Sequence, residues 1–357
     1  MKNKTGLVLV GILFGFGLTA FAQPPRLTNA QLTSRPATAG LSGIIQTLVS
    51  EQSPAWIGYR VPMIPGEHNL CCYGFRNGRR MSGGCRLEET GGTNMQSSGK
   101  EVLPESGESL LVLLRAEAGR IQKILLFTEE CVLDGGGLPL YWLTDVGAAE
   151  SISFLSRFAT GAEGDARTER NLSDSAIFAI AFHKDPAADR ELERFVAPGQ
   201  PDSLRERTSF WLGNARGRRG YEILSRLVRE DSSERVREQA VFALAQSKEP
   251  EAVRAIIEVA KADRSTRVRS QALFWLSWKA GEESAKAITD AIENDPETEV
   301  KKAAVFALFQ LPKDAGVPRL IEVARTNRNP AVRKQAMFWL GQSKDPRALA
   351  FFERILK

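Results

Sequence analysis

The chain has 357 residues, 43% of them hydrophobic, which is enough to bury a sizeable core in one or two domains. Its 48 Lys and Arg against 43 Asp and Glu give a net charge of +5, and the two signs are interleaved along the sequence. Nucleic-acid-binding proteins gather basic residues on one face, so this pattern argues against a nucleic-acid partner.

The first 22 residues predict an export signal. Lys2 and Lys4 precede an apolar run over residues 7–20, and Ala20-Phe21-Ala22 forms a small-x-small cleavage site. We therefore expect an exported protein, periplasmic or secreted, whose mature chain begins at Gln23. An uncleaved N-terminal anchor is the alternative. No other run is long and apolar enough to span a bilayer, so we expect no membrane-embedded segment after cleavage.

Residues 23–39 are polar and rich in Pro, and they predict a linker. Residues 40–145 predict a small α+β or mainly β domain that carries all four cysteines. Its expected elements are a helix over 41–48, a strand over 56–61, a long loop over 66–100, a hairpin of 109–115 with 121–128, and short strands over 131–133 and 138–143. A Gly-rich turn that starts at Asp134 separates the last two strands.

The cysteines of an exported protein are expected to form disulfides. Adjacent Cys71 and Cys72 are poor partners for each other, so we expect them to pair with Cys85 and Cys131 in one order or the other. Two alternatives are a zinc site that adds His68, although its spacing matches no standard zinc motif, and free or mixed thiols.

A 32-residue period dominates the rest of the chain. Each unit places a branched apolar residue six positions before a Phe, a small residue two positions before it, and Leu or Ile two positions after it. The phenylalanines are Phe178, Phe210, Phe242, Phe274, Phe306 and Phe338. A fixed period of this length is typical of a stacked repeat array. We expect six units of 32 residues in 146–357, about thirteen helices, and a terminal cap over 348–356.

This half of the chain resembles the HEAT-like repeat family, especially its short form noted in phycobilisome lyases. The resemblance rests on an acidic residue followed by Val-Arg-x-x-Ala-x-x-x-Leu. The motif stands as Asp231 with Val236-Arg237 and Ala240, Asp263 with Val268-Arg269 and Ala272, and Asp295 with Val300-Lys301 and Ala304, while Asn327 replaces the acid before Val332-Arg333. The resemblance implies an α-solenoid in which the acids and bases tie neighbouring repeats together. It fixes no function, because the family includes scaffolds, adaptors and a few enzymes.

The phenylalanines lie on the side of their helices opposite the predicted core. With about 100° per residue from the leading Val, Ala and Leu fall near 40° and 80°, whereas Phe falls near 240°. Amides flank this stripe three and ten positions after the Val: Gln239, Gln271 and Gln335, then Gln246, Gln310 and Gln342. The resemblance places this face on the concave surface. The rings then either pack on one another or form a ladder of ligand contacts.

Other aromatic and titratable residues give weaker signals. The residue after each Phe alternates between Ala and Trp (Ala179, Trp211, Ala243, Trp275, Ala307, Trp339), and its angle predicts complementary packing in the core. Trp278 breaks this alternation and is a candidate for an exposed contact. His183, beside Asp185, is expected to be a capping or surface residue rather than a catalytic base.

The sequence thus predicts an exported non-enzymatic scaffold or adaptor that binds a protein or peptide on the concave face. We identify no catalytic set, no cofactor and no metal site. The alternative is that the cysteine-bearing domain is a hydrolase or metal-binding unit that the array presents. A glycan of the cell envelope is a weaker alternative for the ligand of the aromatic face.

Overall fold

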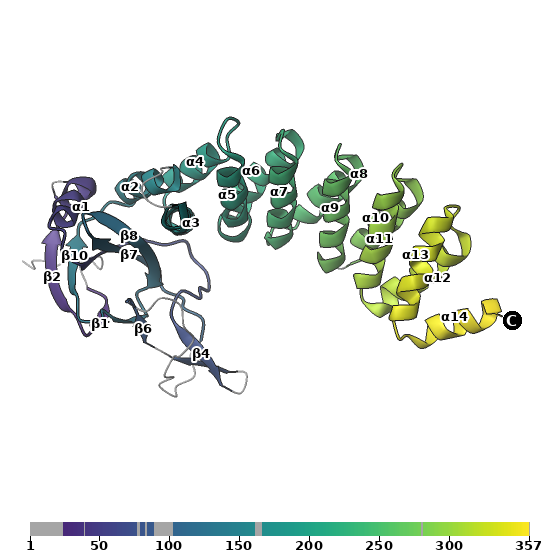
Figure 1. The fold of residues 1–357 in the computed structure, drawn as a ribbon, viewed down its shortest axis with the longest axis horizontal. Helices are drawn as coiled ribbons and strands as arrows, with labels where there is room; N and C mark the ends of the chain where they lie inside the picture. Colours follow the sequence, from purple (N-terminus) through teal and green to yellow (C-terminus); the bar gives the residue numbers. More distant parts are fainter. Residues whose placement is uncertain are drawn as a thin grey trace, which may run out of the picture.

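The structure is a computed structural model that describes residues 24–38, 40–76, 79–82, 84–88, 103–160, 166–279 and 281–356. The expected export signal lies outside these residues. A sheet domain forms one end of the molecule, and an array of paired helices leads away from it as an arch (Figure 1). Within the described part of the chain, no helix is both long and apolar enough to cross a membrane.

The sheet domain contains one helix and ten strands among the described residues. Their bounds are β1 (Arg26–Thr28), β2 (Gln31–Pro36), α1 (Leu41–Ser50), β3 (Ala55–Pro62), β4 (Tyr73–Arg76), β5 (Arg79–Ser82), β6 (Cys85–Arg86), β7 (Ser109–Glu117), β8 (Arg120–Thr128), β9 (Val132–Asp134) and β10 (Pro139–Thr144). The main sheet has the order β2-β10-β3-β7-β8, in which β10 runs parallel to both neighbours. A smaller parallel sheet has the order β1-β9-β6, and β4 pairs with β5.

Both faces of the main sheet are covered, so its central strands are apolar on both sides. In β7, Leu110 and Leu114 belong to a core shared with the helices, whereas Leu111 and Leu113 belong to a second core. That second core also holds Trp142 from β10 and the cysteines near the small sheet. The first core continues without a break from the sheet into the helical array.

The expected linker over 23–39 is wrong in its structured part, because β1 and β2 lie within it. Each of these strands adds to the parallel edge of a sheet: Arg26–Thr28 pairs with Val132–Asp134, and Gln31–Pro36 pairs with Pro139–Thr144. Both partners are more than one hundred residues away in the chain, so nothing local indicates the pairing. Because β9 pairs with β1 and β10 pairs with β2, the two strands belong to different sheets and do not form a hairpin with each other.

The disulfide prediction is confirmed, and the structure decides the order. Cys71 is bonded to Cys131, and Cys72 is bonded to Cys85. The zinc alternative is therefore wrong, because a sulfur in a disulfide is no thiolate ligand. His68 is held in another way: its Nε2 lies 3.0 Å from the carbonyl oxygen of Ile64.

The array consists of thirteen helices among the described residues of 148–356, as the repeat period predicts. They are α2 (Ala148–Thr160), α3 (Ala166–Phe182), α4 (Pro186–Phe195), α5 (Asp202–Ala215), α6 (Gly217–Glu230), α7 (Glu234–Gln246), α8 (Ala252–Ala262), α9 (Thr266–Lys279), α10 (Glu282–Asn294), α11 (Thr298–Gln310), α12 (Lys313–Thr326), α13 (Pro330–Gln342) and α14 (Pro346–Leu356). The six helices α3, α5, α7, α9, α11 and α13 pack side by side in one layer, and the alternate helices form the second layer. The repeat architecture is thus an α-solenoid.

Buried ion pairs join successive repeats, as the family resemblance implies. Arg237 contacts Asp263 through Nε and Nη2 at 2.8 and 3.1 Å, and Arg269 contacts Asp295 in the same way. Arg205 supplies one more pair, with Nη1 2.8 Å from Asp231 Oδ2. Where Lys301 and Asn327 occupy the corresponding positions, Lys301 Nζ donates to the carbonyl oxygen of Glu293 instead.

Candidate functional site

The six phenylalanines form one continuous stripe on the first layer of helices, here called the aromatic stripe. Phe338 is exposed at 54%, and the other five are half-buried. The Val, Ala and Leu positions of the same helices are buried, as the helical wheel predicts. Each ring therefore has one part in contact with protein and another part in contact with solvent, so the stripe both contributes to packing and forms an accessible surface.

The tryptophans that follow every second Phe join this stripe, although their position predicted full burial. Trp211, Trp275 and Trp339 are only half-buried, whereas the alternating alanines are completely buried. Each Trp packs against the Phe of the preceding repeat. At the two other junctions between repeats, the Phe of one repeat packs against the Phe of the next. The centroid distances are 4.2 Å for Phe178–Trp211, 5.9 Å for Phe210–Phe242, 4.8 Å for Phe242–Trp275, 6.3 Å for Phe274–Phe306 and 4.8 Å for Phe306–Trp339.

Together the six Phe and three Trp form what we call the aromatic ladder, which runs through all six repeats. Several rings stack nearly parallel, with interplanar angles of 3° for Phe178–Trp211 and 7° for Phe274–Phe306. In each stacked pair one ring covers a face of the other, and the ring edges are not covered by that contact. Aromatic edges carry the positive part of the ring quadrupole and suit apolar side chains and carbonyl oxygens.

The flanking amides are free to bond a ligand. Gln246, Gln310 and Gln342 are exposed, and Gln239, Gln271 and Gln335 are half-buried. None of the six side chains makes a hydrogen bond with another described residue. The amide of Asn214, by contrast, donates to the carbonyl oxygen of Phe210 in its own helix. The ladder is thus bordered by unpaired donors and acceptors at several successive repeats.

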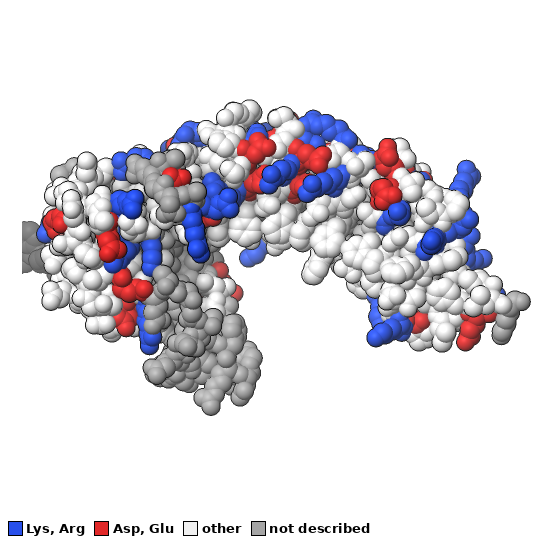
Figure 2. Space-filling model, viewed as in Figure 1, with Lys and Arg blue, Asp and Glu red and all other residues white. Residues whose placement is uncertain are grey.

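Ion pairs between repeats line the beginning of the ladder. Arg207 lies 3.4 Å from Asp174, and the two border a groove of about 490 Å³ whose floor includes Phe178, Phe210 and Trp211. Burial raises the pKa of Asp174, and Arg207 opposes this rise. Figure 2 shows that charged side chains gather on the outer side of the arch, while its hollowed side is largely uncharged in this view.

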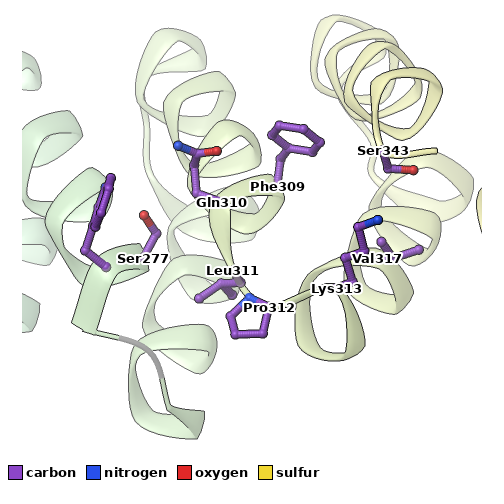
Figure 3. A pocket seen from close by; sticks show the side chains of 9 residues that line it. Ser277, Phe309, Gln310, Leu311, Pro312, Lys313, Val317 and Ser343 are labelled. Atoms are coloured by element: carbon purple, nitrogen blue, oxygen red, sulfur yellow. The ribbon is translucent and has the colours of Figure 1, made fainter. Parts of the chain in front are cut away.

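A second cavity, of about 630 Å³, lies where the end of α9 faces α11, α12 and the end of α13; we call it the notch (Figure 3). Its lining residues are Ser277, Trp278, Phe309, Gln310, Leu311, Pro312, Lys313, Val317 and Ser343. Trp278 is exposed at 67%, in agreement with its expected exposure. Sequence reasoning missed Phe309 and Lys313, because only the fold brings them beside Trp278.

His183 is completely buried, so a surface position is wrong, whereas the expected capping role holds, since its Nδ1 lies 2.7 Å from the carbonyl oxygen of Ala179 at the end of α3. Its Nε2 lies 2.9 Å from Ser151 Oγ, which lies 2.9 Å from the Tyr59 hydroxyl oxygen. Burial, together with the nearby Arg216, lowers the pKa of His183 to about 4. This enclosed network connects β3 with α2 and α3, and it has no access for a substrate.

The sheet domain offers little support for a metal or hydrolytic site. All four cysteines are in disulfides, and the described residues contain no group of three His, Cys, Asp or Glu placed to hold a metal ion. The Gly-rich segment after Asp134 is a turn in the structure, in which Asp134 Oδ1 accepts from the Gly136 amide. What remains as a candidate site is the ladder with its two cavities.

Comparisons with known proteins concern the array. Residues 192–277 and 285–357 match the family model described as HEAT repeats. No curated protein sequence matches the chain. Three similar solved structures are human deoxyhypusine hydroxylase (17% identity, 58% of this chain, 90% of that chain, TM-score 0.27), the complex of CpcE and CpcF of phycocyanin lyase from Nostoc sp. PCC7120 (22%, 43%, 99%, 0.33) and Kap121p (12%, 54%, 25%, 0.34). Similarity at this level assigns no activity.

Proposed function

Because residues 192–277 and 285–357 match the model of HEAT repeats, we propose that the chain is a non-enzymatic scaffold that binds an extended segment of a partner protein along its aromatic ladder. The observation that carries this proposal is the coincidence of half-exposed rings and unpaired amides at successive repeats. Solenoids commonly use such repeated surfaces for recognition.

The dimensions fit an extended polypeptide. Packed helices lie about 8–10 Å apart, and an extended chain rises about 3.3 Å per residue, so each repeat meets two or three residues of the segment. Glutamine amides are suited to bond its backbone, and ring edges are suited to pack against its apolar side chains. A glycan is not favoured, because sugars stack on open ring faces, whereas at three joints of the ladder the rings are stacked and cover one face of each other.

We also propose that this binding takes place outside the cytoplasm, in the periplasm or after secretion. Two disulfides are compatible with an oxidising compartment, and the sequence of residues 1–22 has the pattern of an export signal. No specific observation favours the alternative in which the sheet domain is a hydrolase or a metal-binding unit.

Selection from a displayed library of random peptides, each about twelve residues long, tests the binding proposal. Peptides enriched on the purified chain are then titrated against a variant in which Gln239, Gln246 and Gln271 are all replaced by Ala. Loss of three hydrogen bonds is expected to lower affinity by about 3 kcal/mol, on the order of a hundredfold.

The matched control is Gln31→Ala, which removes an exposed amide of β2 in the sheet domain and is expected to leave affinity unchanged. The proposal fails if no peptide is enriched, or if the triple variant binds the enriched peptides as tightly as the parent chain does.

A further inference from the structure

The notch is where the repeated surface departs from its own pattern in two adjacent repeats. Ten positions after the leading apolar residue, four repeats have Asn or Gln, the first repeat has Phe182, and α9 has Trp278. One position earlier, five repeats have Ala, Gly or Ser, but α11 has Phe309. These two large aromatic residues line the same cavity. Two neighbouring repeats thus depart from the repeat pattern on the same surface. This indicates a role in binding at this place rather than a requirement of helix packing.

The walls of the notch are firm and mostly apolar. Phe309 stacks on Trp339 with centroids 4.8 Å apart, which fixes its ring in the ladder. Leu311, Pro312 and Val317 complete the apolar lining. The hydroxyl of Ser277 donates to the carbonyl oxygen of Phe274, and that of Ser343 donates to the carbonyl oxygen of Leu340. Both hydroxyl protons are therefore already hydrogen-bonded within the protein and do not require a polar group on the ligand.

The charge in the notch has one sign. Of its nine lining residues only Lys313 is charged, and its side chain makes no hydrogen bond or ion pair with any described residue. Lys313 is close enough to Asp345 to lower the pKa of that carboxyl group, but Asp345 and Asp314 form their ion pairs with Arg347, at 2.8 and 3.4 Å. An ammonium group without an ion-pair contact at the rim of an apolar cavity favours a ligand with an anionic group beside an apolar one.

Resting on the proposed function, we propose that the notch anchors the bound segment by accepting one large apolar side chain whose immediate neighbour is an Asp or Glu that pairs with Lys313. Trp278 and Phe309 enclose the apolar side chain, and Gln310 bonds the backbone beside it. The residue lies within the segment rather than at its end, because the ladder continues on both sides of the notch, to Phe338 in one direction and to Phe178 in the other.

The library selection is repeated on three further variants of the full chain. For the parent chain, the enriched peptides are expected to share a large apolar residue next to an acidic one. Lys313→Glu is expected to exchange the acidic preference for Lys or Arg at the same place. Trp278→Ala is expected to lower the affinity of the enriched peptides about thirtyfold, as loss of a central aromatic contact does. Lys286→Glu, which reverses an exposed charge on α10 outside the notch, is expected to change neither.

Two synthetic peptides test whether the carboxylate that pairs with Lys313 comes from an Asp or Glu side chain or from the C-terminus of the bound segment. One peptide carries the apolar and acidic pair in its interior, and a second ends in the apolar residue with a free terminal carboxylate. The interior pair is expected to bind more tightly. Tighter binding of the second peptide would overturn the proposal, as would an enriched motif that Lys313→Glu leaves unaltered.

The two proposals fail in different ways. If substitution of Gln239, Gln246 and Gln271 weakens binding while Trp278→Ala and Lys313→Glu do not, the ladder binds the segment and the notch does not anchor it. If no peptide is enriched on the parent chain, both proposals fall.

Discussion

The joint between the sheet domain and the array is held by neutral hydrogen bonds, whereas the central joints of the array are held by buried ion pairs. At the first joint, Tyr59, Ser151 and His183 form a chain of contacts of 2.9 Å each. At the central joints, Arg237–Asp263 and Arg269–Asp295 are each 2.8 Å apart. The two kinds of joint should therefore be destabilised by different changes. Acid should destabilise the joint between the sheet domain and the array, and removal of one charged partner should destabilise the central joints.

The last full joint of the array follows neither pattern. Lys301 and Asn327 occupy the positions of a buried Arg and Asp, but Asn327 donates to Glu293 and Lys301 bonds a backbone carbonyl. The notch involves the same repeats but lies at the other ends of their helices, since it is lined by the last residues of α9 and α11 and the first residues of α12. The proposed anchoring site and the joint without an Arg–Asp pair are therefore separate features of these repeats.

Removing one partner of a central ion pair is expected to give the largest effect. Asp263→Ala leaves the guanidinium of Arg237, whose side chain is 2% exposed, buried without its counter-charge. The free energy of unfolding should fall by about 4 kcal/mol, because the desolvation penalty of the charge remains. Denaturant unfolding measures this. Asp290→Ala, which removes an exposed partner of Lys261, is the control and should cost well under 1 kcal/mol; equal losses in both variants would contradict the comparison.

Acid is expected to weaken the first joint by an intermediate amount. The pKa of His183 is about 4 in the fold, below its ordinary value, because burial disfavours the charged ring. The unfolded chain therefore binds a proton that the fold does not, so this stability is complete above pH 6.5 and is lost progressively as pH falls toward 4. Between pH 7 and pH 5 the loss amounts to about 2 kcal/mol.

The check on this prediction is the same unfolding measurement with His183→Gln. The variant starts less stable at pH 7 but should lose about 2 kcal/mol less than the parent chain between pH 7 and pH 5. The charged neighbours of His183, Asp185 and Arg216, are present in both proteins, so the two differ only at His183. An identical pH dependence in both would rule out His183 as the source.

Completing the last joint should give the smallest effect. The double substitution Lys301→Arg with Asn327→Asp supplies the pair found at the central joints and is expected to raise the free energy of unfolding by about 1 kcal/mol. Asn327→Asp alone should lower it by a similar amount, because the new carboxylate meets Glu293, to which Asn327 now donates. If the double variant gains nothing, the geometry of this joint differs from that of the central ones in more than its side chains.

The sequence predicts the features of this molecule that repeat, because repetition makes a three-dimensional arrangement visible along the chain. The period of 32 gives the helices, the buried Val, Ala and Leu positions, and the stripe of Phe. The buried ion pairs Arg237–Asp263 and Arg269–Asp295 follow from the family motif. The same angular argument was wrong for the tryptophans, whose rings are only half-buried and pack on the preceding Phe.

Features that depend on a single long-range contact were not predictable in this way. The parallel pairing of β1 and β2 depends on strands far along the chain, and so does the burial of His183 against Ser151 and Tyr59. The notch was predictable from the sequence only in part. Phe309 is visible in the sequence as the one large residue in a row of small ones, but its proximity to Lys313 and Trp278 requires the fold.

The alternation of Ala and Trp in the ladder restricts how this array can change in length. Each Trp packs on the Phe of the preceding repeat, as Trp275 does on Phe242, while the same position in the neighbouring repeats is a buried Ala. Deleting α7 and α8 alone would bring Trp211 and Trp275 onto adjacent helices and abolish this alternation. Duplication or loss of two repeats at a time keeps the alternation, so the packing unit of this array is the 64-residue pair.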